Sequence, residues 1–257
     1  MHPWLIGVPG TIAAAAGVIA YGGLYPRAQL FGSTICRTNS ARKLAITFDD
    51  GPNPDITPKL LDLLAKYNAP ATFFLIGRYL RECPELAREI AARGHVIGNH
   101  TESHPNLLWK RSTEIRVELR LTHSAIKSVL GAPPKWFRPP FGFRNPWLAG
   151  EARELNMRVV MWTLLPGDWR APSGEWLIGR MQPIADRAKR ALQRASSAGT
   201  GVKTSTGEII CLHDGSHHEQ NADRTATLAA LEYWLPRWRD LGLEFVTIEN
   251  AVSAPAS

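Results

Sequence analysis

Beyond residue 43, short apolar runs alternate with longer segments of helical spacing. The runs are brief and rich in branched or aromatic residues, so they predict buried strands, at 44–48, 71–76, 95–98, 136–138, 158–162, 208–212 and 244–248. Amphipathic helices are expected between them, the first after the Asp55/Thr57-Pro58 start signal and the others at 84–93, 112–130, 146–156, 174–195 and 225–241. Strands that alternate with helices indicate an α/β fold with parallel strands, either a barrel or a doubly wound sheet.

The N-terminal segment has a different pattern. The first 26 residues contain no Asp, Glu, Lys or Arg, and residues 3–24 are apolar, small or uncharged. Because about 20 such residues cross a bilayer, and Trp4 and Tyr21 suit its interfaces, we expect a transmembrane anchor. A cleaved signal, with small residues at 13–16, and a buried helix remain as alternatives. We therefore divide the chain into an anchor or signal segment at 1–26, a linker at 27–42 and a main domain at 43–257.

Composition is that of a globular protein, with 257 residues of which 44% are hydrophobic and 21% charged. The formal net charge of +7 would fit nucleic acid, an anionic membrane or an acidic polymer. Five of these seven charges fall in residues 180–203, where Asp186 is the single acid among six basic residues: Arg180, Arg187, Lys189, Arg190, Arg194 and Lys203. This stretch contains no aromatic residue, which argues against nucleic-acid binding. We interpret it as a basic helix and loop that contact an anionic polymer or lipid headgroups.

Two of the predicted strands end in residues that can bind a metal. Parallel α/β folds place active groups at the carboxyl ends of their strands. Asp49 and Asp50 end the first strand and point in different directions, so one can bind an ion while the other faces substrate or water. His100 and His104 share one face of a helical turn after the third strand. With Asp50 they form a two-His, one-carboxylate set that suits Zn²⁺ and does not exclude Fe, Co, Ni or Mn.

Three later strand ends carry further chemistry. Arg138 is followed by two prolines, and its rigid guanidinium could hold a carboxylate in place. The next strand leads to Asp168 and Trp169, an acid beside a large flat apolar group. His213 ends the sixth strand and titrates in the range that suits proton transfer. Each motif alone is typical of a structural turn, but their coincidence at successive strand ends indicates an active site.

The motifs TFDDGP, HTESH, RPPFG, DW and LHDG, in this order over about residues 43–251, resemble the polysaccharide deacetylases, also called the NodB-homology domain or carbohydrate esterase family four. The resemblance implies a distorted (β/α) barrel of about seven parallel strands and metal-dependent removal of acetyl groups from sugars. It makes Asp49 the general base and His213 the general acid. It implies further that Arg138 orients Asp49, that Asp168 tunes His213, and that Asp50, His100 and His104 bind the metal. Substrate contacts are expected from Pro139, Phe141, Trp169 and Leu212.

We therefore expect a metal-dependent hydrolase that removes N-acetyl groups from N-acetylglucosamine-containing polysaccharide of peptidoglycan or chitin type. Its cofactor would be a divalent metal, for which Zn²⁺ is the first choice and Co²⁺, Ni²⁺, Fe²⁺ and Mn²⁺ are the alternatives. Acetylxylan esterase, deformylase and cyclic-imide hydrolase activities, or an inactive carbohydrate-binding homologue, are the alternatives.

The expected partners are the acetylated carbohydrate and a membrane that holds residues 3–24, with no nucleic acid and no obligate protein partner. The polymer favours an extracytoplasmic domain, whereas basic residues after the span favour the cytoplasm, so the orientation stays open. One departure from the family pattern is Leu165, where an acid often stands three residues before the DW pair. His217 and His218, on the loop after LHDG, are expected to be accessory substrate contacts at most.

Overall fold

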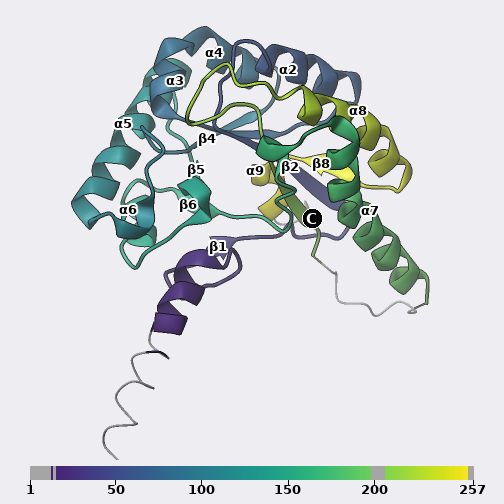
Figure 1. Ribbon diagram of the computed structural model, residues 1–257, viewed down its shortest axis with the longest axis horizontal. Helices are drawn as coiled ribbons and strands as arrows, with labels where there is room; N and C mark the ends of the chain where they lie inside the picture. Colours follow the sequence, from purple (N-terminus) through teal and green to yellow (C-terminus); the bar gives the residue numbers. More distant parts are fainter. Residues whose placement is uncertain (1–12, 14–15, 198–205, 254–257) are drawn as a thin grey trace, which may run out of the picture.

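The computed structural model describes residues 13, 16–197 and 206–253 and consists of a curled parallel sheet surrounded by helices (Figure 1). Its strands are β1 (Thr34–Ile35), β2 (Lys43–Asp49), β3 (Thr72–Leu75), β4 (Val96–Asn99), β5 (Trp136–Phe137), β6 (Arg158–Val160), β7 (Glu208–His213) and β8 (Glu244–Val246). Their spatial order is β1-β6-β5-β4-β3-β2-β7, and β8 pairs with the start of β2. A bridge between Leu164 and Ile210 joins the chain after β6 to β7, so the sheet curls into the distorted barrel that the sequence predicts.

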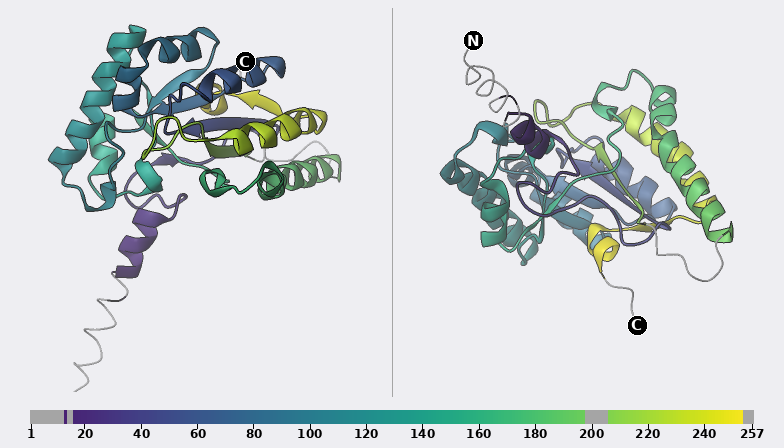
Figure 2. Two further views of the ribbon diagram at one scale, coloured as in Figure 1. Left: turned by 45° about the horizontal axis from the view of Figure 1, so that its top comes forward. Right: turned by 90° about the horizontal axis from the view of Figure 1, so that it is seen from below.

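Helices cover the outside of this barrel, as Figures 1 and 2 show. They are α2 (Thr57–Lys66), α3 (Gly77–Glu82), α4 (Pro84–Ala92), α5 (Ser112–Leu130), α6 (Leu148–Glu154), α7 (Gly174–Ser197) and α8 (Thr225–Asp240). The short helix α9 (Ile248–Val252) lies inside this ring of helices in Figure 1, next to β2. The crossover helices return the chain to the same end of the sheet before each new strand, which is why the strands run parallel. All the carboxyl ends therefore meet at one end of the barrel.

The core lies on both faces of the strands. In β2, Leu44, Ile46 and Phe48 pack with the leucines of α2 and the tryptophans of α8, whereas Ala45 belongs to a second apolar cluster. Burial on both faces explains why the strands are continuous apolar runs with no polar alternation.

The structure adds elements that the hydrophobic pattern did not predict. β1 lies inside the segment 27–42 that we expected to be a linker, and it pairs with β6. A two-residue strand is too short to show any periodicity, so no sequence signal marks it. β5 and β6 also end earlier than predicted, and Ile248 begins α9 instead of ending the last strand.

The predicted membrane span 3–24 is described only in part. Its described end, residues 16–24, is helical. No helix within the described part of the chain is long and apolar enough to cross a membrane. The end of this N-terminal helix is tied to the domain by Arg144, whose backbone N–H donates to the Gly23 carbonyl at 3.0 Å. Its buried guanidinium donates to the carbonyl oxygens of Ala28, at 2.7 Å, and Tyr25.

The basic stretch 180–203 is partly described. Its first half lies on α7 as predicted, where Arg180 donates to the Pro166 carbonyl and Arg187 forms an ion pair with Glu208 at 2.7 Å. The Arg194 side chain and Lys203 lie outside the described residues. A contact between this stretch and an anionic polymer or lipid headgroups stays a prediction.

Candidate active site

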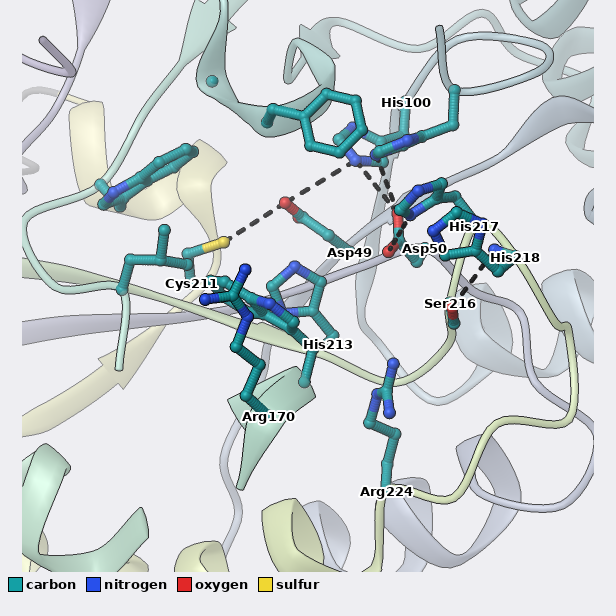
Figure 3. Close-up of a pocket in the computed structure, with 16 residues that line it drawn as sticks. Asp49, Asp50, His100, Arg170, Cys211, His213, Ser216, His217, His218 and Arg224 are labelled. Carbon is teal, nitrogen blue, oxygen red and sulfur yellow. Dashed lines mark hydrogen bonds and ion pairs between the residues drawn. The ribbon is translucent and has the colours of Figure 1, made fainter. Parts of the chain in front are cut away.

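The strand ends surround a cavity of about 640 Å³ (Figure 3). Most of the residues that the sequence analysis assigned to catalysis, metal binding or substrate binding lie on the wall of this cavity. Several residues that it did not assign to the site lie there too. The lining residues are Asp49, Asp50, His100, His104, Phe141, Gly142, Trp162, Leu165, Trp169, Arg170, Cys211, His213, Ser216, His217, His218 and Arg224.

Asp49 and Asp50 both reach this cavity because the backbone turns between them. Asp49 is the last residue of β2, whereas Asp50 takes a left-handed conformation with φ of 71°. Such backbone costs a non-glycine residue about 1–3 kcal/mol and is found mostly at functional sites. The turn rests on Gly215, where a Cβ would lie 2.2 Å from the Asp50 carbonyl oxygen. Beside it lies Asp214, whose pKa burial raises to about 7, although a hydrogen bond from Thr57 opposes the shift.

Asp50, His100 and His104 present their ligand atoms to one another. Asp50 Oδ1 lies 3.4 Å from His100 Nε2 and 3.2 Å from His104 Nε2, and this buried oxygen has no hydrogen-bond partner among the described residues. Ligands bound tetrahedrally at about 2.0–2.1 Å stand about 3.3 Å apart, so the donor set fits a divalent ion such as Zn²⁺.

Both histidines are held in a form that can ligate. His100 Nδ1 is 2.7 Å from the Arg138 carbonyl oxygen, which can only accept, so Nδ1 carries the proton and the Nε2 lone pair faces Asp50. Burial lowers the pKa of His104 to about 2 even though Asp50 opposes the shift, so its imidazole is neutral. A neutral imidazole is the form that binds a metal.

A second group with ligand atoms close together consists of Asp49, Cys211 and His213. It is a poorer metal site. Arg138 already binds Asp49, and burial raises the pKa of the Cys211 thiol well above its usual value, so the metal-binding thiolate is disfavoured. The thiol lies 3.3 Å from Asp49 Oδ2 and donates to it.

Arg138 fixes Asp49. Its fully buried Nη1 donates to Asp49 Oδ1 at 2.8 Å and to Thr47 Oγ1 at 2.7 Å. Two backbone carbonyls accept from the rest of the guanidinium, which also lies over the Phe74 ring at 4.3 Å. The second oxygen of Asp49 is therefore held toward the cavity, 3.8 Å from His100 Nε2.

His213 is bound by Asp168 through two hydrogen bonds. The imidazole Nδ1 donates to Asp168 Oδ1 at 2.9 Å, and the His213 backbone N–H donates to Oδ2 at 2.6 Å. Burial disfavours the imidazolium, but the charge and hydrogen bond of Asp168, with smaller contributions from Asp50 and Asp49, raise the pKa of His213 to about 9. His213 is therefore protonated at neutral pH, with Nε2–H free to act as a proton donor.

The four predicted substrate contacts divide into two pairs. Phe141 and Trp169 line the cavity, and the Trp169 ring meets the edge of His213 with centroids 5.0 Å apart. Leu212 and Pro139 are buried and do not line it. Leu212 belongs to the hydrophobic core, because alternate residues of β7 face opposite sides and Cys211 and His213 take the cavity side.

Sequence reasoning gave too little weight to the loop after β7. The His217 ring stacks on His104 with centroids 4.3 Å apart, and its Nδ1 is 3.8 Å from Asp50 Oδ2. Tyr79 and Arg78 of α3 hold this loop by donating to the carbonyls of Ser216 and His217. Arg170 and Arg224 also line the cavity and went unnoticed, and Arg170 directly follows the DW pair.

Comparison with known proteins places this geometry in a family. A family model described as polysaccharide deacetylase matches residues 37–160. A chitooligosaccharide deacetylase of Azorhizobium caulinodans is 34% identical over 215 residues, which are 81% of this chain and 93% of that protein. The chain belongs to the polysaccharide deacetylase family.

Other members of the family resemble it as closely. A peptidoglycan-N-acetylglucosamine deacetylase of Bacillus cereus is 35% identical over 82% of this chain and 89% of its own length. A crystal structure of a peptidoglycan N-acetylglucosamine deacetylase in complex with 4-naphthalen-1-yl-N-oxidanyl-benzamide superposes with a TM-score of 0.71 at 30% identity. The superposition covers 85% of this chain and 92% of that structure, so the resemblance extends over most of both chains.

Proposed function

We propose that this polysaccharide deacetylase hydrolyses the N-acetyl group of N-acetylglucosamine units in a polymer or oligomer of peptidoglycan or chitin type, and that it needs a divalent metal. The proposal rests on one observation. Three ligand atoms of Asp50, His100 and His104 converge on one wall of the cavity that Asp49 and His213 also line. The names of the relatives, chitooligosaccharide and peptidoglycan-N-acetylglucosamine deacetylases, support the substrate.

Asp50, His100 and His104 would hold the metal, with Zn²⁺ preferred by two imidazoles and a carboxylate, and with Co²⁺, Ni²⁺, Fe²⁺ or Mn²⁺ as alternatives. When bound, such an ion polarises an acetyl carbonyl and lowers the pKa of a coordinated water.

The protein's own residues would move the protons. Asp49 accepts the proton of the attacking water at Oδ2, because Arg138 occupies Oδ1. His213 donates its Nε2 proton to the sugar nitrogen as the carbon–nitrogen bond breaks, so the products are acetate and an amine. Asp168 holds the imidazolium at Nδ1 and keeps it charged until that step.

Neighbouring groups would bind the acetyl group. The backbone N–H of Phe141 is our candidate donor to the oxygen on which negative charge develops. Trp169, Trp162 and Leu165 line the cavity and form an apolar surface on which the methyl group could pack. We also propose that residues 3–24 anchor the protein with its domain outside the cytoplasm, where such polymers lie.

Acetate release from the full-length protein tests the function. The metal-stripped enzyme, with and without added Zn²⁺ or Co²⁺, would be given N-acetylated chitooligosaccharide, peptidoglycan and acetylxylan side by side. We expect metal-dependent release from the first two. No acetate from any of the three, with metal shown to be bound, would refute the proposal and favour another acyl substrate or an inactive homologue.

Three variants test the assigned roles. Asp49→Asn and His213→Ala should each lower kcat by about 10²–10⁴-fold and leave metal content unchanged. His100→Ala should lose the metal itself. His123→Gln, on the partly exposed surface of α5 away from the cavity, is the control and should match the wild type. Near wild-type turnover in Asp49→Asn or His213→Ala would show that the roles are wrongly assigned.

A further inference from the structure

Two arginines on the cavity wall form no salt bridge with any described residue, although hydrogen bonds and, to a smaller extent, the charge of Arg224 lower the pKa of the neighbouring, exposed Asp223. Among the described residues, the Arg170 guanidinium makes no hydrogen bond or ion pair, and it lies over the adjacent Trp169 ring, 5.9 Å from the centroid. Arg224 donates from Nε to the Gly215 carbonyl at 3.0 Å and from Nη1 to the Asp223 carbonyl at 2.9 Å. Neither bond neutralises its charge.

Both charges face the reaction centre. Arg170 ends the short helical turn Asp168–Arg170, and Arg224 lies directly before α8. Figure 3 shows them near His213 with both guanidinium groups directed toward the cavity that they line. Arg224 is partly buried and Arg170 is exposed, so a ligand can reach both.

The acidic side chains in and beside the cavity already have partners other than the two arginines. Asp49 is bound by Arg138, Asp168 by His213, and Asp50 faces His100 and His104. The imidazolium of His213 is paired with Asp168 in the same way and leaves no acid for the two arginines. Among the described residues, Arg170 and Arg224 therefore form no salt bridge at this side of the cavity, and their guanidinium groups are available to an anionic ligand.

We propose that Arg170 and Arg224 form an anion-binding subsite that takes a carboxylate on the sugar next to the N-acetylglucosamine under attack. A planar guanidinium matches a carboxylate through paired hydrogen bonds, so arginine suits this role better than lysine. The subsite would make the enzyme selective for an acidic glycan over a neutral one. This inference rests on the proposed function and names its substrate class.

The test compares substrates with and without carboxylate charges. The probes are a peptidoglycan oligosaccharide with free lactyl carboxylates, the same oligosaccharide with those carboxylates amidated, and neutral chitotetraose. The wild type should have its highest kcat/KM with the free carboxylate. Arg170→Glu should raise KM for that substrate about tenfold and reduce its advantage over the amidated form, and added salt should shrink the wild-type preference.

Matched variants separate the subsite from general damage. Arg158→Gln removes an exposed arginine at the start of β6, the opposite end of the barrel, and should keep the full preference. Arg170→Lys should retain part of the preference for the free carboxylate. Arg224→Gln also removes the bond to the Gly215 carbonyl, so its thermal unfolding is measured together with its preference.

The outcomes for this inference and for the proposed function are distinct. Equal kcat/KM for the free and amidated substrates, unchanged in Arg170→Glu, would reject the subsite and leave the deacetylase function intact. Absence of acetate from all three probes would reject the function. In that case calorimetric binding of the free and amidated oligosaccharides to Asp49→Asn would still decide whether the arginines select a carboxylate.

Discussion

Single residues of this site owe their chemistry to the partners that hold them. His213 is protonated at neutral pH because, against the opposing effect of burial, Asp168 raises its pKa to about 9. Arg138 directs one oxygen of Asp49 toward the cavity by occupying the other. The sequence could supply the residues and their order, since each follows a strand. It could not supply the φ of 71° at Asp50, which depends on the packing of Gly215 against the turn.

The pH profile tests the link between Asp168 and His213. Asp168→Asn removes the carboxylate charge, so the pKa of His213 should fall from about 9 to its ordinary 6.5 or below. The alkaline limit of kcat/KM should move down with it, and activity at pH 8 should drop by at least about tenfold because the proton donor is neutral there. Asp240→Asn, at the end of α8, is the control. An unchanged alkaline limit would separate His213 from proton donation.

Stability should depend on the same pair with a defined sign. The pKa of His213 is raised in the folded protein, so the folded state binds the proton more tightly than the unfolded state. The stabilisation is therefore complete below about pH 6.5 and is lost as the pH rises through about 9. Asp168→Asn should remove this alkaline loss.

At the scale of elements, the hydrophobic pattern predicted the seven strands from β2 to β8, because each is a buried run between helices. Their parallel order brings the five motifs to one end of the barrel. The pattern missed β1, which is too short, and the loop at 215–218, which contains no periodic segment. Its contacts with α3 and His104 come from tertiary packing that no local signal encodes.

The turn after β2 depends on glycine in the neighbouring loop. A Cβ at Gly215 would lie 2.2 Å from the Asp50 carbonyl oxygen and 2.7 Å from its carbon, and backbone atoms cannot move aside as a side chain can. Gly215→Ala should therefore destabilise the protein by about 1–3 kcal/mol and weaken metal binding by displacing Asp50. Urea unfolding and metal titration measure the two effects.

The control for that substitution is another glycine with free space. Gly150 lies within α6 and has no atom within 4 Å of an added Cβ. Gly150→Ala should stabilise the protein by up to about 1 kcal/mol, since alanine is the better helix former. If Gly215→Ala unfolded at the wild-type urea concentration and bound metal normally, the turn would not depend on this contact.

At the scale of the whole molecule, the domain begins earlier than the hydrophobic pattern suggested. Arg144 is fully buried, and its guanidinium is satisfied by carbonyls of Tyr25 and Ala28 in the segment before β1. Its backbone N–H is bonded to Gly23 at the end of the N-terminal helix. The segment before β1 therefore belongs to the folded domain, and it also connects that domain to the apolar N-terminal residues.

Two truncations distinguish these roles. A chain that starts at residue 16 keeps the described contacts of Arg144 with Gly23, Tyr25 and Ala28 and should unfold at the temperature of the full chain. A chain that starts at residue 38 loses β1 and leaves a buried guanidinium without two acceptors, each worth about 1.5–3 kcal/mol. The loss of both acceptors sums to about 3–6 kcal/mol, so its Tm should fall by about 6–24 °C, since 1 kcal/mol corresponds to about 2–4 °C at this size.

Arg144→Met then shows whether the unpaired guanidinium causes the loss of stability in the shorter chain. In the chain from residue 16 the substitution should be strongly destabilising, because it removes both side-chain bonds. In the chain from residue 38 it should cost much less or even stabilise, because it removes a buried charge that has lost its acceptors. Equal effects of Arg144→Met in the two backgrounds, or equal Tm values for the two truncated chains, would mean that the segment before β1 is a passive linker after all.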